Sequence, residues 1–148
     1  MNTDVTPSES PPTASPAHPI TVLLVDDQLF IGEVVRRMLL GQPDIAYHYC
    51  ADGAEAVRRV QEIQPDVILQ DLVMPGADGI ELVRQYRAHE RTRITPVILL
   101  SSSEDAATRA RAAAAGVNEF MVKPPPKAAL IGKIRSLSAK PGPPPGNG

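Results

Sequence analysis

The chain has few of the features that mark secreted, membrane or nucleic-acid-binding proteins. It contains one cysteine, Cys50, so no disulfide can form within the chain and a reducing cytoplasm is the expected location. No apolar run approaches the roughly 20 residues of a membrane span. Residues 1–19 lack both a basic start and an apolar stretch, so they are not a signal peptide. The net charge of −2 gives no basic stripe for nucleic acid. We therefore expect a cytoplasmic protein that binds neither membranes nor nucleic acid directly.

The length and the proline distribution indicate one domain with two tails. The chain has 148 residues, of which 43 % are hydrophobic and 22 % charged, an ordinary balance for a globular protein. Nine of the 16 prolines fall within residues 1–19 and 141–148. Segments rich in Pro, Ser and Gly bury too little apolar surface to offset their chain entropy. We predict disordered tails at residues 1–19 and 139–148 and a folded domain at residues 20–138.

Inside this domain, strand-like and helix-like patterns alternate. Short apolar runs predict strands at residues 20–25, 45–50, 67–70, 96–100 and 119–122. Apolar residues at helical spacing predict helices near residues 31–39, 53–63, 80–86 and 130–137, and an alanine-rich run closed by Gly116 predicts one at residues 104–115. A loop containing Pro75, Gly76 and Gly79 follows the third strand. The alternation predicts an α/β fold in which a five-stranded parallel sheet carries helices on both faces.

Polar side chains gather where four of these strands end. They are Asp26, Asp27, Asp71, Ser101 and Lys123. Ligands of open parallel sheets bind outside the carboxyl ends of the strands. Three carboxylates repel one another unless a cation lies among them, and all-oxygen ligands suit Mg²⁺. A carboxylate beside a metal ion and a lysine can act as a nucleophile toward phosphorus. Lysine and serine can then stabilise the transferred phosphoryl group.

The segments VLLVDDQ, DLVMPGADG, PVILLSSS and the Lys-Pro pair after EFMV resemble the signature segments of response-regulator receiver domains of two-component signalling. The resemblance covers residues 20–138 and implies a flavodoxin-like (βα)5 fold. It implies that Asp71 is the phosphoacceptor, that Asp27 binds Mg²⁺ directly and that Asp26 binds it through water. The carboxylate of Asp71 and the backbone carbonyl of Val73 are the further expected metal ligands.

The resemblance also implies roles for the remaining site residues. Ser101 matches the family's hydroxyl residue, Lys123 its lysine and Phe120 its switch aromatic. The peptide bond between Lys123 and Pro124 is typically cis in the family. The segments QDLVMPG and VDDQ are loosely similar to those of receivers that precede diguanylate cyclase domains.

The implied function is a phosphorylation switch. A sensor histidine kinase or phosphotransfer protein would donate a phosphoryl group to Asp71. Ser101 would then move toward the phosphoryl group, and Phe120 would rotate into the space that Ser101 vacates. We expect a stand-alone receiver, not an enzyme, whose face formed by residues 104–138 binds an effector protein or a second copy of the chain.

The sequence departs from the family pattern in two places. Pro125 and Pro126 stand where the family commonly has an aromatic, and they stiffen the entry to the last helix. Val73 and Ser103 occupy the positions that flank the path of attacking water in the family. Since valine cannot orient water, we hypothesise a phosphoryl group with a long lifetime.

Other interpretations compete with this one. Asp26 and Asp27 could instead cap the first helix, since Asp is favoured at caps. Asp71 could simply begin a turn, and Phe120 could be only a packing residue. Ser102 or Ser103 could replace Ser101. At the level of function, the alternatives are an adaptor with a receiver fold that is never phosphorylated and a Mg²⁺-dependent aspartyl-nucleophile phosphatase. The phosphatases carry a DxD motif after the first strand, whereas Gln28 and Leu29 follow the acidic pair here.

Overall fold

The computed structural model describes residues 19–138. The tails predicted from composition lie outside the described residues, apart from Pro19. The secondary structure runs from Ile20 to Ser138. Within this part of the chain, no helix is both long and apolar enough to cross a bilayer.

Five parallel strands form the central sheet, as predicted. They are β1 (Ile20–Val25), β2 (Ile45–Cys50), β3 (Val67–Asp71), β6 (Val97–Ser101) and β7 (Glu119–Val122). Their order in the sheet is β2-β1-β3-β6-β7, with every neighbouring pair parallel. The connection after β1 runs to β2 on one side and the connection after β3 runs to β6 on the other, so the crevice between the ends of β1 and β3 is where ligands bind in such folds.

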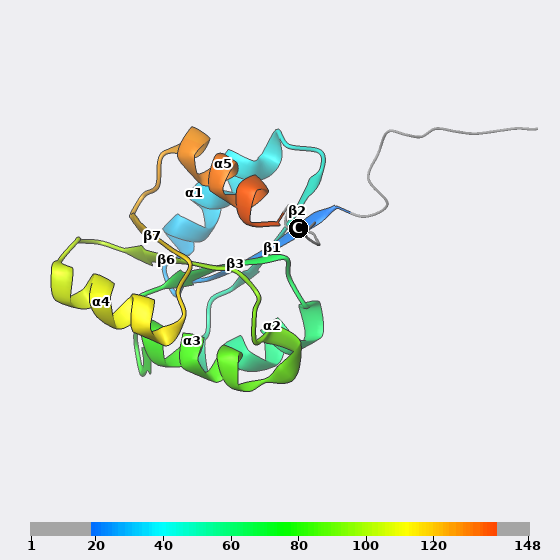
Figure 1. Cartoon of the computed structure of the whole chain (residues 1–148). Helices are drawn as coiled ribbons and strands as arrows, with labels where there is room; N and C mark the ends of the chain where they lie inside the picture. Colours follow the sequence, from blue (N-terminus) through cyan, green and yellow to red (C-terminus); the bar gives the residue numbers. More distant parts are fainter. Residues whose placement is uncertain (1–18, 139–148) are drawn as a thin grey trace, which may run out of the picture.

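Helices cover both faces of the sheet (Figure 1). Helices α1 (Leu29–Leu40) and α5 (Lys127–Ser138) pack on one face, and α2 (Ala56–Ile63), α3 (Gly79–Ala88) and α4 (Ala106–Ala115) on the other. Strand residues alternate between the two cores, because successive side chains of a strand point to opposite faces. Leu23 packs toward α2, α3 and α4, whereas Leu24 packs toward α1 and α5. The predicted fold class is confirmed.

Several predicted boundaries were wrong by one to three residues. Strand β3 includes Asp71, and β6 spans Val97–Ser101, so both site residues are the last residues of strands. The helix predicted at 53–63 begins with a separate 3₁₀ turn, Gly53–Glu55. The helix predicted from residue 104 begins at Ala106 because Asp105 caps it, accepting a hydrogen bond from the Thr108 amide at 3.1 Å. A further 3₁₀ turn, Glu90–Thr92, follows α3.

The loop after Asp71 contains structure that the sequence did not predict. Strands β4 (Val73–Met74) and β5 (Ala77–Asp78) pair antiparallel as a small hairpin. Gly76 turns the chain between them with a φ of 72°, a conformation that costs other residues energy. Two-residue strands carry no alternation of apolar and polar side chains, which explains why periodicity missed them.

Candidate functional site

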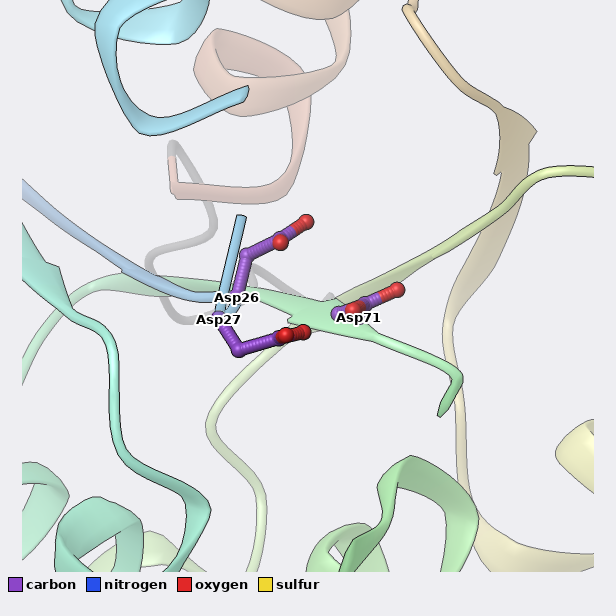
Figure 2. Close-up of side chains that lie close together, drawn as sticks. All are labelled: Asp26, Asp27 and Asp71. Atoms are coloured by element: carbon purple, nitrogen blue, oxygen red, sulfur yellow. The ribbon is translucent and has the colours of Figure 1, made fainter. Parts of the chain in front are cut away.

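Three carboxylates meet at the carboxyl ends of β1 and β3. Asp26 and Asp27 directly follow β1, and Asp71 ends the neighbouring strand β3. Oxygen atoms of the three side chains lie within 4.8 Å of one another. Figure 2 shows the three carboxylates projecting to the same side of the sheet edge. Asp26 and Asp71 are buried. The parallel sheet thus converts two separate sequence motifs into one acidic cluster.

Among the described residues, Lys123 is the only one whose ammonium group contacts these carboxylates. It follows β7, and its Nζ donates to Asp26 Oδ2 at 3.2 Å and to Asp71 Oδ1 at 3.1 Å. The lysine side chain is 9 % exposed, so these contacts are shielded from water. The Lys123–Pro124 peptide bond is cis, as the family resemblance implied.

The protonation of Asp71 reflects this crowding. Burial raises the pKa of the Asp71 carboxyl group, and the nearby charge of Asp26 raises it further, while the hydrogen bond from Lys123 opposes both. Among the described residues, Asp71 Oδ2 is buried without a hydrogen-bond partner. One lysine therefore leaves the three carboxylates undercompensated. A cation among them would partner the remaining oxygen and lower the repulsion.

The donor set fits Mg²⁺. Carboxylate oxygens are hard ligands, and Mg²⁺ binds through a few carboxylates while keeping several waters. A cleft of about 520 Å³ opens beside the cluster, with room for those waters and for a phosphoryl group. Its lining includes Asp27, Asp71, Ser101 and Lys123, so these four predicted site residues face one shared space.

Ser101 lies in this cleft at the end of β6, next to β3. Its hydroxyl donates to the Ser103 carbonyl at 2.6 Å and accepts from the Ser103 amide at 3.2 Å. Ser102 and Ser103 also line the cleft but are exposed, whereas Ser101 is buried. Of the three serines, Ser101 alone is buried and belongs to a strand that pairs with β3.

Val73 and Phe120 lie in different surroundings. Val73 lines the cleft with a side chain that is largely exposed, and it begins β4 two residues after Asp71. Phe120 in β7 is half-buried and packs against the core beneath α4. The Arg109 guanidinium lies 4.9 Å from the centre of its ring. Phe120 does not line the cleft, so among the predicted site residues it alone is separated from the acidic cluster.

Two glutamines near the site were not singled out from the sequence. Gln28 accepts a third hydrogen bond from Lys123 Nζ at 2.8 Å. Gln70 directly precedes Asp71 and is fully buried in β3. Two sequence features could have indicated these residues. Gln28 directly follows the acidic pair, and Gln70 is an amide at the end of an otherwise apolar run.

The comparisons with known proteins agree with this geometry. The family profile described as the response regulator receiver domain matches residues 22–135. A protein-glutamate methylesterase/protein-glutamine glutaminase of Methanospirillum hungatei is 40 % identical over 106 residues, which are 71 % of this chain and 31 % of that protein. The transcriptional regulatory protein ResD of Bacillus subtilis is 34 % identical over 78 % of this chain and 47 % of its own length. The chain thus spans less than half the length of these relatives.

A similar solved structure is the receiver domain of a sensor histidine kinase from Pseudomonas aeruginosa, which has a magnesium ion coordinated in its active-site cleft. It superimposes with a TM-score of 0.75 and 30 % identity, over 82 % of this chain and 99 % of the other. The family profile, the strand order and the acidic cluster lead to the same conclusion. This chain belongs to the response regulator receiver domain family of two-component signalling.

Proposed function

We propose that this receiver accepts a phosphoryl group on Asp71 from the phosphohistidine of a sensor histidine kinase or a phosphotransfer protein. The observation that carries the proposal is the environment of Asp71. Its carboxylate holds one oxygen against Lys123, has a second oxygen without a partner among residues 19–138, and faces a cleft large enough for phosphate. Such a carboxylate is placed to act as a nucleophile.

In the proposed transfer, an oxygen of Asp71 attacks the phosphorus atom while the bond from phosphorus to the histidine nitrogen breaks. The nitrogen keeps the electron pair of the broken bond. Lys123 stays close enough to neutralise charge on the phosphoryl oxygens, and the Ser101 hydroxyl can exchange its bond to Ser103 for one to a phosphoryl oxygen. The protein's contribution is therefore to hold a nucleophile and two donors around one space.

The metal ion of the proposal is Mg²⁺. The side chains of Asp26, Asp27 and Asp71 and the backbone carbonyl of Val73 would hold it, with Asp26 acting through water. When bound, Mg²⁺ supplies positive charge that offsets the carboxylates and the phosphoryl oxygens. The support from this chain is the spacing of the three carboxylates and the unpartnered oxygen of Asp71.

Phosphorylation would add about −1.5 to −2 charge at one edge of the sheet. As Ser101 turns toward this charge, Phe120 would move inward, leaving its contact with Arg109. The switched surface is then the face of α4, β7 and α5 within residues 104–138, and an effector protein or a second copy of the chain would bind there. We further propose that the protein acts as a stand-alone regulator in the cytoplasm, without an enzymatic activity of its own.

The test is phosphorylation of the full chain with acetyl phosphate and Mg²⁺, read by intact mass. We expect the wild type to gain one phosphoryl group and Asp71→Asn to gain none. Asp105→Asn is the matched control, because asparagine also caps helices and Asp105 lies outside the cleft. This variant should be labelled like the wild type.

Two results would contradict the proposal. Labelling of Asp71→Asn at the wild-type rate would remove Asp71 as the acceptor. An unlabelled wild type would favour the adaptor alternative, and steady turnover of p-nitrophenyl phosphate would favour the phosphatase.

A further inference from the structure

Gln70 is a polar side chain in the middle of a hydrophobic layer. It is fully buried, and the alternation of β3 points it toward α3, away from the core beneath α1 and α5. Its Oε1 accepts a hydrogen bond at 2.6 Å from the hydroxyl of Tyr86 in α3, which is also fully buried. Burying an amide and a phenol costs free energy unless both are hydrogen-bonded, and an apolar pair would avoid that cost.

The other end of the Gln70 amide reaches the chain that follows it. Its Nε2 donates to the backbone carbonyl of Asp71 at 3.1 Å and lies 3.8 Å from the thioether sulfur of Met74. One side chain thus contacts both ends of the segment 71–74. This segment contains the phosphoacceptor Asp71 and Val73, whose carbonyl is a proposed metal ligand.

The Asp71 carbonyl determines which way the Gln70 amide points. A backbone carbonyl can only accept hydrogen bonds, so the NH₂ group of Gln70 must face Asp71. The amide oxygen then faces Tyr86, whose hydroxyl donates to it. Burial raises the pKa of Tyr86 far above its usual value, which keeps the hydroxyl protonated as a donor.

Two main-chain hydrogen bonds hold Leu72, which lies between Asp71 and Met74 in the chain. The Leu72 amide donates to Leu100 at 2.9 Å, and the Gly79 amide donates to the Leu72 carbonyl at 2.7 Å. These two bonds hold Leu72 alone. The side chain of Gln70 contacts Asp71 before it and Met74 after it.

We propose that Gln70 and Tyr86 are positioning residues that hold the backbone of residues 71–74, and through it the Asp71 carboxylate and the Val73 carbonyl, in the geometry for binding Mg²⁺. The proposal rests on the function proposed above. Neither residue touches the phosphoryl group or the metal ion. Both act from the core between β3 and α3, and β3 is the strand that ends at Asp71.

Three variants separate positioning from stability. Gln70→Leu leaves the Tyr86 hydroxyl without a partner, and Tyr86→Phe leaves Gln70 Oε1 without one, so each should lower the urea midpoint. The double variant, Gln70→Leu with Tyr86→Phe, removes both partners of the Gln70–Tyr86 hydrogen bond, so neither side chain is left unpaired. Its midpoint should recover most of the loss, because replacing both partners of a buried hydrogen bond by apolar groups is nearly neutral. The carbonyl of Asp71 nevertheless stays without its donor in the double variant.

The first measurement uses no metal ion and no phosphate. Amide hydrogen exchange at Leu72 and Gly79, followed by NMR, reports the stability of the segment. We expect exchange at both amides to be about tenfold faster in the double variant, the effect of losing one net hydrogen bond. The second measurement is Mg²⁺ binding by calorimetry, where we expect the Kd to rise by a factor of about 10.

Ile68→Val is the control, because it removes a methyl group from the same strand and the same core and alters no hydrogen bond to residues 71–74. It should lower the urea midpoint and leave the Mg²⁺ Kd unchanged. A double variant that binds Mg²⁺ like the wild type overturns the proposal, whatever its stability. A wild type that binds Mg²⁺ but takes no phosphoryl group would contradict the proposed function alone.

Discussion

Lys123 donates from its Nζ to Asp71 Oδ1 at 3.1 Å, although 52 residues separate the two in the sequence. Asp71 ends β3 and Lys123 follows β7, and β6 lies between these strands in the sheet. The lysine side chain therefore reaches past the end of β6 to contact the acidic cluster. The contact joins the edge of the sheet that borders α4 and α5 to the proposed phosphorylation site.

Replacing Lys123 should expose the repulsion within the acidic cluster. We expect Lys123→Met to lower the free energy of unfolding in EDTA by about 3 kcal/mol, because breaking a buried ion pair leaves uncompensated charge. Added Mg²⁺ should recover much of this loss, and urea denaturation with and without Mg²⁺ measures both. Lys133→Met is the control, since its pair with Glu119 is exposed and worth less than about 1 kcal/mol. Equal losses in the two variants would contradict the argument.

Gly79 should tolerate no side chain. A Cβ at this position would lie 2.0 Å from the Asp71 carbonyl oxygen, and the main chain there cannot move aside. We expect Gly79→Ala to destabilise the fold by about 1–3 kcal/mol. Gly132 in α5 has open space around it, so Gly132→Ala should stabilise by about 0.5–1 kcal/mol through helix propensity. Thermal melts of the two variants should shift in opposite directions, and a neutral Gly79→Ala would be inconsistent with the close contact.

Asp44 should contribute stability that depends on pH. The Arg135 guanidinium beside it holds the pKa of the Asp44 carboxyl group below its usual range. Because the pKa is lower in the folded state, the stabilisation is complete above about pH 4, the unfolded value, and is lost as the pH falls through the folded pKa. We expect Asp44→Asn to cost about 0.5 kcal/mol at pH 7, since the pair is partly exposed.

Urea denaturation at pH 7 and at successively lower pH tests this expectation. The difference between wild type and Asp44→Asn should shrink below pH 4, and Arg135→Gln should behave in the same way. A deficit that keeps its full size at the lowest pH would show that the loss is not electrostatic.

Val73 should prolong the life of the phosphoryl group. It lines the cleft two residues after Asp71, and its apolar side chain cannot orient an attacking water. We expect the phosphorylated protein to decay over minutes or longer at neutral pH with Mg²⁺, and Val73→Asn to shorten that lifetime severalfold. Phosphate release after removal of acetyl phosphate measures the decay. Ile94→Asn controls for a polar change at an exposed apolar residue elsewhere. A wild-type half-life of seconds would contradict the hypothesis.

The fold could be predicted because its signals are local and repeated. Five apolar runs alternate with helical patterns, and the central strands β3 and β6 are buried on both faces, so their runs are continuous and easy to recognise. The hairpin of β4 and β5 could not be predicted, because two-residue strands show no periodicity. The ends of β3 and β6 were misplaced because Asp71 and Ser101 are polar, although their backbones continue the strands.

The sequence alone determined the order of strands and helices and which residues stand at the strand ends. Since the carboxyl ends of parallel strands share one edge, that order was sufficient to bring Asp26, Asp27, Asp71, Ser101 and Lys123 to the same side. The tertiary structure decided the contacts between them. Whether Lys123 reaches Asp71, and whether Gln70 finds Tyr86, depends on how β7 and α3 pack against β3. These distances arise from packing between segments far apart in the chain, and no local pattern of residues encodes them.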